Sequence, residues 1–326
     1  MKKILIATSA LVATAGIAHA EVSVSGKAIA GLVYNSEGVE KTRLLNKVNI
    51  EFNGSGESDG GLQFGFNTNH IVTNNGGSVD NDDTTVYMSG AFGKLSFGAV
   101  AEADEVAGLS DIGWDGLDVD DVAEALVGDE LGDIMGMGIG HNVNYTYSTG
   151  PVTFSLSGKL ATSHTATNDS YAAGVKYNFG TGYVGLGYGD HEFAGLRAAS
   201  VVSVFGGATF DAIKVSALYS DARLKDGAGV KTDAQAYGFN ASYTMDALTL
   251  SMGYGKAKFD ANTMGIALKQ QSFGVGAAYD LGGGASVSGG IARVESVGDE
   301  NLSGAAARVG AKTKETRADF GVTFKF

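Results

Sequence analysis

Apolar and polar residues alternate one by one through most of the chain, in sixteen separate segments. Residues 22–34 form the first such segment and residues 318–326 the last. Successive side chains of a β-strand point to opposite faces, so each segment predicts a strand with one apolar and one polar face. The connections between segments are alternately short and long, which indicates that neighbouring strands are antiparallel.

The final segment shows this pattern most clearly. Phe320, Phe324 and Phe326 lie on its apolar face, and Asp319 and Lys325 lie on the other. The free C-terminal carboxylate of Phe326 would stand directly on the apolar face, which suits a strand that meets lipid and ends at the membrane interface. An even number of strands can close, and an open edge in hydrocarbon would leave backbone groups unsatisfied. We therefore predict an all-β fold, a 16-stranded antiparallel transmembrane β-barrel whose last strand pairs with its first.

A soluble β protein is the competing architecture. A sandwich of this length usually divides into two domains with a linker, and no linker is visible. A calcium-binding β-roll needs repeated G-G-x-G-x-D nonapeptides, which are absent. Aromatic residues also recur at segment ends, which is typical of the interfacial girdles of a membrane barrel. They include Tyr34, Tyr147, Tyr177, Phe179, Tyr188, Tyr219, Tyr254 and Tyr279.

The first 20 residues have the features of a cleaved secretory signal. Lys2 and Lys3 precede a short apolar stretch, and A-H-A at residues 18–20 is a cleavage site, so residues 21–326 form a single mature domain. Removal of the two lysines leaves 21 basic against 36 acidic residues, which argues against nucleic acid as a partner. The chain has no Cys, so disulfides and thiolate metal sites are excluded.

The alternation stops over residues 101–141. This stretch contains twelve acidic residues and no Lys or Arg, together with apolar residues that need a surface to pack on. Val122 and Leu126 are four residues apart and follow two acids, which indicates a short helix. One interpretation is an acidic loop that projects into solvent. We expect instead a loop folded into a wide barrel, with its apolar side on the wall and its carboxylates in the water, so that it narrows the channel.

Charged side chains on the two sides of this aperture would set its selectivity. Rings of carboxylates favour cations. The candidate acids on the loop are Asp118, Asp120, Asp121 and Glu124. Strand parity directs several basic side chains into the lumen, and the best candidates for a basic cluster are Lys27, Arg43 and Lys47. Opposed acids and bases would produce a transverse electric field that penalises apolar solutes.

Several motifs resemble the general porins of alphaproteobacteria, the Rhodobacter type, and the resemblance covers essentially all of residues 21–326. They are G-A-F-G-K at 90–94, Y-T-Y-S at 145–148, V-G-L-G-Y at 184–188, Y-D-L-G-G-G-A-S-V-S-G-G-I-A at 279–292 and the F-K-F end. The resemblance implies a homotrimer of 16-stranded barrels in the outer membrane of a Gram-negative bacterium, each with a third loop folded into the lumen. It implies passive diffusion of ions and small hydrophilic solutes, and we expect contact with outer-membrane lipids and lipopolysaccharide.

The resemblance also bears on individual loop residues. The stretch D-I-G-W-D-G-L-D-V-D-D at 111–121 resembles the acidic segment of that family's third loop, which adds Asp111 and Asp115 to the candidate acids. In the family the loop acids face basic wall residues, and this chain has fewer arginines there than the family usually shows. Loop carboxylates of family members can bind Ca²⁺, so a structural calcium ion is compatible with the clustered acids. No other cofactor is expected.

Two other functions remain open from the sequence. A barrel of this kind can also be an outer-membrane enzyme of the lipase or protease type, or a structural or adhesin barrel without conductance. The four mature histidines, His70, His141, His164 and His191, form no H-x-x-x-H or H-E-x-x-H motif. The G-x-S-x-G match at residues 56–60 lies in a predicted turn between two strands and not at a nucleophile elbow. We therefore expect a cation-preferring channel rather than an enzyme, and planar-bilayer conductance would separate the three readings.

Overall fold

The computed structural model describes residues 21–74, 80–135, 140–161, 169–193, 197–225, 229–260, 268–297 and 312–326. The predicted signal over residues 1–20 lies outside the described residues. The described part contains sixteen strands, one for each alternating segment. They are β1 (Glu21–Asn35), β2 (Thr42–Glu57), β3 (Gln63–Asn74), β4 (Asp80–Gly90), β5 (Gly93–Gly98), β6 (Val143–Thr149), β7 (Val152–Gly158), β8 (Ser170–Phe179), β9 (Gly182–Phe193), β10 (Arg197–Phe210), β11 (Ile213–Lys225), β12 (Lys231–Met245), β13 (Leu248–Phe259), β14 (Leu268–Gly282), β15 (Ala285–Val297) and β16 (Lys312–Lys325).

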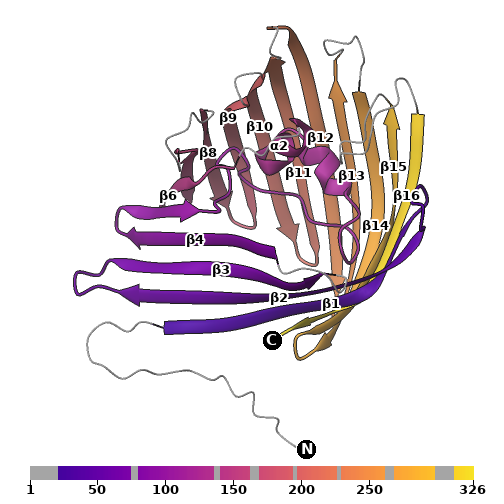
Figure 1. Ribbon diagram of the computed structural model, residues 1–326, viewed down its shortest axis with the longest axis horizontal. Helices are drawn as coiled ribbons and strands as arrows, with labels where there is room; N and C mark the ends of the chain where they lie inside the picture. Colours follow the sequence, from indigo (N-terminus) through magenta and orange to yellow (C-terminus); the bar gives the residue numbers. More distant parts are fainter. Residues whose placement is uncertain are drawn as a thin grey trace, which may run out of the picture.

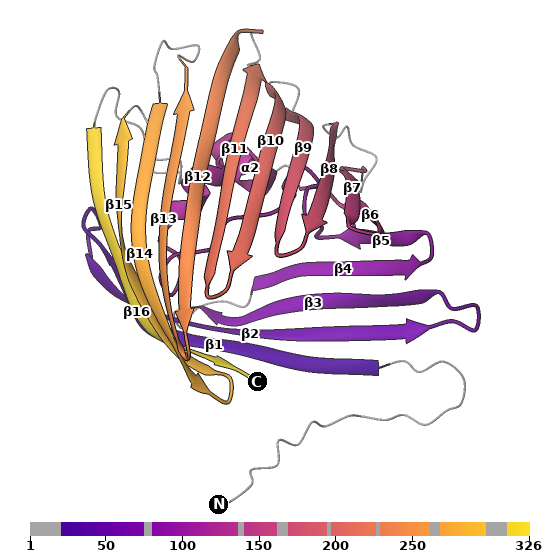
Figure 2. The same ribbon diagram turned by 180° about the vertical axis from the view of Figure 1, so that it is seen from behind.

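The strands form one closed barrel in which each strand is antiparallel to its neighbours in sequence. Figures 1 and 2 show this ring from two opposite sides. The predicted closing pair is confirmed, because β16 lies beside β1 with Phe324 opposite Ala28. At the seam the N–H of Gly26 donates to the carbonyl of Phe326 at 2.7 Å, and the N–H of Phe326 donates back at 3.0 Å. Closure pairs the strand edges that lipid would leave unsatisfied.

The two faces of the wall carry different side chains, as the alternation predicts. On β16, Phe320 and Phe324 are 61% and 45% exposed on the outside, whereas Asp319 and Thr323 are 6% and 8% exposed on the inside. Large apolar side chains are likewise exposed on the outer face of most other strands. An apolar exterior of this extent is suited to lipid rather than water.

The two ends of the barrel differ in the length of their connections. At one end strands are joined by tight turns, as at residues 246–247 between β12 and β13, and the seam near Gly26 and Phe326 lies at this end. Asp246 has a φ of 51°, the left-handed conformation that such a turn uses. The opposite end carries the longer connections. In bacterial outer-membrane barrels the short turns face the periplasm and the longer loops face outward.

The connection from β5 to β6 folds into the ring and contains two helices, α1 (Val119–Glu124) and α2 (Gly128–Met135). α1 contacts β11–β14, and both helices lie inside the ring in Figure 1. Asp120 and Asp121 occupy the first turn of α1, as predicted. We call residues 101–141 the lumenal loop; residues 136–139 of it are not described. No described helix is long and apolar enough to cross a bilayer.

Deleting Phe326 should impair assembly of the barrel more than its conductance. The deletion removes the two seam hydrogen bonds with Gly26, each worth about 1 kcal/mol, but touches no lumenal group. The folded fraction, measured by migration of unboiled protein on a gel, should fall. Channels that do assemble should keep the single-channel conductance of the full chain, and a changed conductance would contradict this account.

Candidate functional site

The apolar side of the lumenal loop packs against the inner wall. Ile112, Val119, Val122 and Leu126 are each 2% exposed or less. A Cβ added to Gly253 of β13 would lie only 3.1 Å from Ile112 and 3.2 Å from Val119. The loop can therefore approach the wall this closely because the wall residues beneath it are small. The other small wall residues under the loop include Ala236, Gly238, Gly255, Ala257 and Gly274.

Asp319 of β16 fixes the loop where it passes the barrel seam. One oxygen of this buried carboxylate accepts the backbone N–H groups of Trp114 and Asp115, each at 2.8 Å. The indole N–H of Trp114 donates to Thr323 at 3.2 Å, and the ring packs on Gly321. A buried carboxylate is costly unless it is hydrogen-bonded. The loop amides therefore satisfy one carboxylate oxygen of Asp319, and this oxygen holds the loop.

Wall side chains also satisfy carbonyl groups of the irregular loop backbone. Asn240 of β12 donates to the carbonyl of Ser110 at 2.9 Å. Ser272 of β14 donates to the carbonyl of Val119 at 2.9 Å. Buried backbone carbonyls need partners, and these polar wall residues supply them where regular secondary structure does not.

Two buried histidines link both ends of the loop to β7–β9. The ring of His141, at the end of the loop, lies 2.7 Å from Ser157 Oγ and 2.6 Å from Ser170 Oγ. Ser170 Oγ also lies 2.7 Å from Nδ1 of His191, and Nε2 of His191 lies 3.5 Å from Asp104 at the start of the loop. Desolvation lowers the pKa of His141 to about 4, so its neutral ring both donates and accepts in this chain of contacts.

Burial also changes the charge of the loop carboxyls. Desolvation, followed by a hydrogen bond with Asp111, raises the pKa of Asp120 to about 9. Desolvation raises the pKa of Glu124 to about 8. Desolvation and then the charge of Asp129 raise the pKa of Glu102 to about 7. At neutral pH Asp120 and Glu124 are therefore mostly protonated and carry little charge.

Other loop acids remain in contact with water and with wall bases. Asp111 and Asp115 are exposed, and Asp118 is half-buried. Asp118 forms an ion pair with Arg317 of β16, and Arg317 also bonds Glu315 at 2.6 Å. The loop and β16 thus form a three-membered charge cluster in the lumen.

Asp115 faces the lysines of β1 and β2. Desolvation and then Asp319 raise the pKa of Asp115, while Lys47 and Lys27 act in the opposite direction. Lys27 and Lys47 both lie on the inward face, where strand register places Lys47 opposite the buried Ile29. Acids of the loop and bases of the wall therefore lie across from one another on this side of the lumen.

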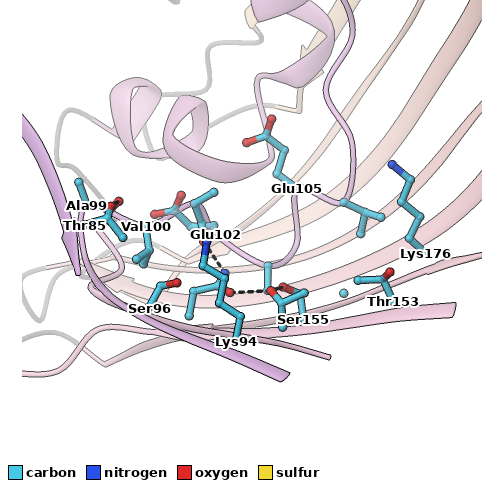
Figure 3. A pocket seen from close by; sticks show the side chains of 16 residues that line it. Thr85, Lys94, Ser96, Ala99, Val100, Glu102, Glu105, Thr153, Ser155 and Lys176 are labelled. Atoms are coloured by element: carbon cyan, nitrogen blue, oxygen red, sulfur yellow. Dashed lines mark hydrogen bonds between the residues drawn. The ribbon is translucent and has the colours of Figure 1, made fainter. Parts of the chain in front are cut away.

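A cavity of about 390 Å³ lies between the start of the loop and the wall of β4–β8. Figure 3 shows its lining, with Lys94 and Lys176 on the wall strands and Glu102 and Glu105 on the loop. The ammonium group of Lys94 lies 4.4 Å from the ring centroid of Tyr87. This cation–π contact stabilises the charged form of Lys94. The pattern of loop acids and wall bases thus continues around the lumen.

Comparison with known proteins places this chain in a family. A family model described as Gram-negative porin matches residues 7–299. A porin of Rhodobacter capsulatus is 31% identical over 335 residues, covering 94% of this chain and 100% of that protein. The chain belongs to the Gram-negative porin family. Its place is therefore the outer membrane, where it forms a channel.

Solved structures share the barrel of this porin. A porin refined at 1.8 Å resolution superposes with a TM-score of 0.72 at 27% identity, covering 94% of this chain and 100% of the other. An anion-selective porin from Comamonas acidovorans superposes with a TM-score of 0.73 at 16% identity over 94% of this chain and 100% of the other. The second likeness concerns the fold alone, so it does not assign charge selectivity to this porin.

The structure changes the role of two predicted site residues. The sequence predicts that Asp120 faces the channel water, but its side chain is only 7% exposed and shares a hydrogen bond with Asp111 of the same loop. Glu124 is half-buried, and its carboxylate accepts the backbone N–H of Leu109. Asp121, also a predicted acid, lies half-buried in the first turn of α1. Among the predicted bases, Lys47 and Lys27 act on Asp115, whereas Arg43 lies four residues before Lys47 on β2, opposite Val33.

Sequence reasoning missed the residues that hold the loop. Parity directs Arg317 into the lumen, but nothing local marks it as the partner of Asp118. The one sequence signal for Asp319 is that it is an acid on the inward face of the last strand, between Arg317 and Gly321. The chain of contacts from His141 to Asp104 brings together five separate segments, so no spacing in the sequence could show it.

The described carboxylates do not fit the calcium site that the family resemblance implies. Asp111 and Asp120 share a hydrogen bond, so this pair retains a proton and lacks two free anionic ligands. Among the residues with described side chains, no three acidic or imidazole groups are placed to hold a metal ion.

Raising the pH should increase the cation preference of the channel, because Glu124 ionises as the pH passes its pKa of about 8. Below that pH the group is neutral and above it the group is negative. The reversal potential in a salt gradient, measured at about pH 6 and about pH 9.5, should shift toward cations. Glu124→Gln should remove part of the shift, because Glu102 and Asp120 ionise over the same pH range, whereas Glu37→Gln, an exposed control, should remove none. An identical shift in both variants would contradict the assignment.

Proposed function

We propose that this porin is a passive channel for ions and small hydrophilic solutes, with a preference for cations. The composition of the lumenal loop supports the preference, since residues 101–141 contain twelve acids and no Lys or Arg. This loop lies inside the barrel, so its exposed acids Asp111 and Asp115 meet the channel water. Carboxylates that line an aqueous pore attract cations.

The acids that remain ionised carry this preference. Asp120 and Glu124 are mostly neutral at pH 7, because their pKa values are about 9 and about 8. The charge of Arg317 is balanced by Asp118 and Glu315. The exposed acids of the loop are thus opposed mainly by wall lysines, which leaves an acidic loop and a basic wall. The resulting transverse field favours polar solutes over apolar ones.

We also propose that three barrels associate in the membrane, in contact with outer-membrane lipids and lipopolysaccharide. OmpT of Vibrio cholerae, which shares the fold with a TM-score of 0.74 at 16% identity over 94% of this chain and 99% of its own, is described in a trimer form. The apolar exterior of this barrel is suited both to lipid and to contact between copies. Closure of the channel in three equal steps would report the three pores.

Asp111→Asn combined with Asp115→Asn should shift the reversal potential toward anions, because it removes two exposed negative charges from the loop. The measurement is a planar-bilayer recording of unboiled protein in a potassium chloride gradient near neutral pH. Glu37→Gln combined with Glu40→Gln removes the same charge from the β1–β2 connection and serves as the matched control.

Three outcomes of this recording would contradict the proposal. They are a wild-type channel that prefers anions, an unchanged reversal potential in the loop variant, and an equal shift in the control. Hydrolysis of an ester or peptide without current would support the barrel-enzyme alternative instead.

A further inference from the structure

A basic cluster lies on the outside of the barrel, near the end that carries the longer connections. Its members are the outward-facing Lys256 and Lys258 of β13 and Lys269 of β14, and the last two are exposed. Strand register places Lys258 directly opposite Lys269. Like charges directly opposite one another in a sheet are destabilising, so this pair is best accommodated by an anion that neutralises both.

The protein's own acids offset only part of this charge. Lys258 bonds Asp260 at 2.6 Å, and Glu295 of β15 pairs with Lys312 and Lys314 of β16. Over the outer face of β13–β16 at this level, five basic side chains meet these two acids, and the exposed Asp233 of β12 lies beside Asp260. The five bases are Lys256, Lys258, Lys269, Lys312 and Lys314. The excess is positive on a chain whose net charge is −13.

Aromatic rings lie directly below the basic cluster on the same strands. Register places Tyr254 between Phe239 and Phe273, and its ring centroid lies 6.1 Å from that of Phe239 and 6.4 Å from that of Tyr237. Aromatic girdles mark the boundary between the hydrocarbon and the headgroups of a membrane. The basic cluster is therefore at headgroup level in the leaflet on the side of the longer connections, which is the outer leaflet.

An apolar groove of about 700 Å³ continues below the rings. Its floor is formed by small residues, Ala241 and Ala277, and its sides by larger ones such as Leu250, Met252 and Ile291. Met252 precedes Lys256 by four residues on β13, a separation of about 13 Å along a strand. An apolar groove below a headgroup-level cluster of bases has the dimensions and polarity of a single acylated lipid.

We propose that this face of β12–β15 is a binding site for one phosphorylated, acylated lipid of the outer leaflet. A phosphate lies between Lys258 and Lys269, and an acyl chain occupies the groove over Ala277. Phosphate neutralises the like-charged pair that the register imposes. The site lies on the outside of the barrel. The proposal therefore rests on the membrane location of the protein and not on the proposed cation preference of its channel.

Native mass spectrometry of the detergent-solubilised protein tests the site, with bisphosphorylated lipid A as the probe. Lys258→Gln combined with Lys269→Gln should weaken retention of the probe at least tenfold. Lys94→Gln combined with Lys176→Gln makes the same change of charge inside the lumen and should leave retention unaltered. Ala277→Phe fills the groove from the outside and should also weaken retention, with folding of every variant checked by its migration without boiling.

The headgroup requirement is tested with dephosphorylated lipid A. The native protein should retain this probe at least tenfold less than the phosphorylated probe, whereas the lysine variant should retain the two probes equally. Retention of the phosphorylated probe should also fall as salt is raised. Unchanged retention in the exterior lysine variant, an equal loss in the lumenal control, or no preference for the phosphorylated probe would each overturn the proposal. Conductance and reversal potential of the exterior variants report separately on the channel.

Discussion

Contact between the apolar side of the lumenal loop and a wall of small residues is the interaction on which the rest of the site depends. Ile112, Val119 and Leu126 are removed from water only because glycine and alanine face inward on β12–β14. Wherever the loop lies flat against this wall, its opposite side faces the aqueous lumen. The same contact therefore positions Asp111 and Asp115 in the channel and keeps the opposite wall clear.

The acidic residues of the loop serve two purposes that conflict, because burial anchors the loop whereas exposure is needed for a carboxylate to act as a charge in the channel. Burial holds the loop but raises the pKa of Asp120 and Glu124, so these acids are lost as charges near neutral pH. The loop is consequently less negative than its twelve acids suggest. Arg317 further reduces the charge through its ion pair with Asp118. The charge that the loop presents to the lumen thus depends on the exposure of individual carboxylates and not on their number.

Much of the architecture could be predicted from the sequence because period-two alternation is a local signal. It identified all sixteen strands, the lipid-facing side of β16 and its closure onto β1. The apolar residues of the loop likewise predicted packing on the inner wall. Parity, however, gives only the face of a strand and not the height or neighbours of a side chain.

That limit explains the differences at the site. Lys27, Arg43 and Lys47 all point inward by parity, yet they lie at different heights, opposite Asn49, Val33 and Ile29 respectively, and the two lysines act on Asp115. Asp319 lies 205 residues from Trp114 in the sequence, and the protonation of Asp120 depends on burial that no pattern encodes. Long-range contacts and desolvation, rather than secondary structure, separate the predicted site from the observed one.

A disulfide between the loop and the wall tests most directly whether the loop is held in the lumen as described. A Cβ on Gly274 of β14 would lie 2.8 Å from the side chain of Val119, and the chain contains no native cysteine. In the variant with Val119→Cys and Gly274→Cys, the bond should form on oxidation, and single-channel conductance should be the same before and after reduction. Failure of the bond to form, or a conductance that changes when it is reduced, would contradict the placement of the loop.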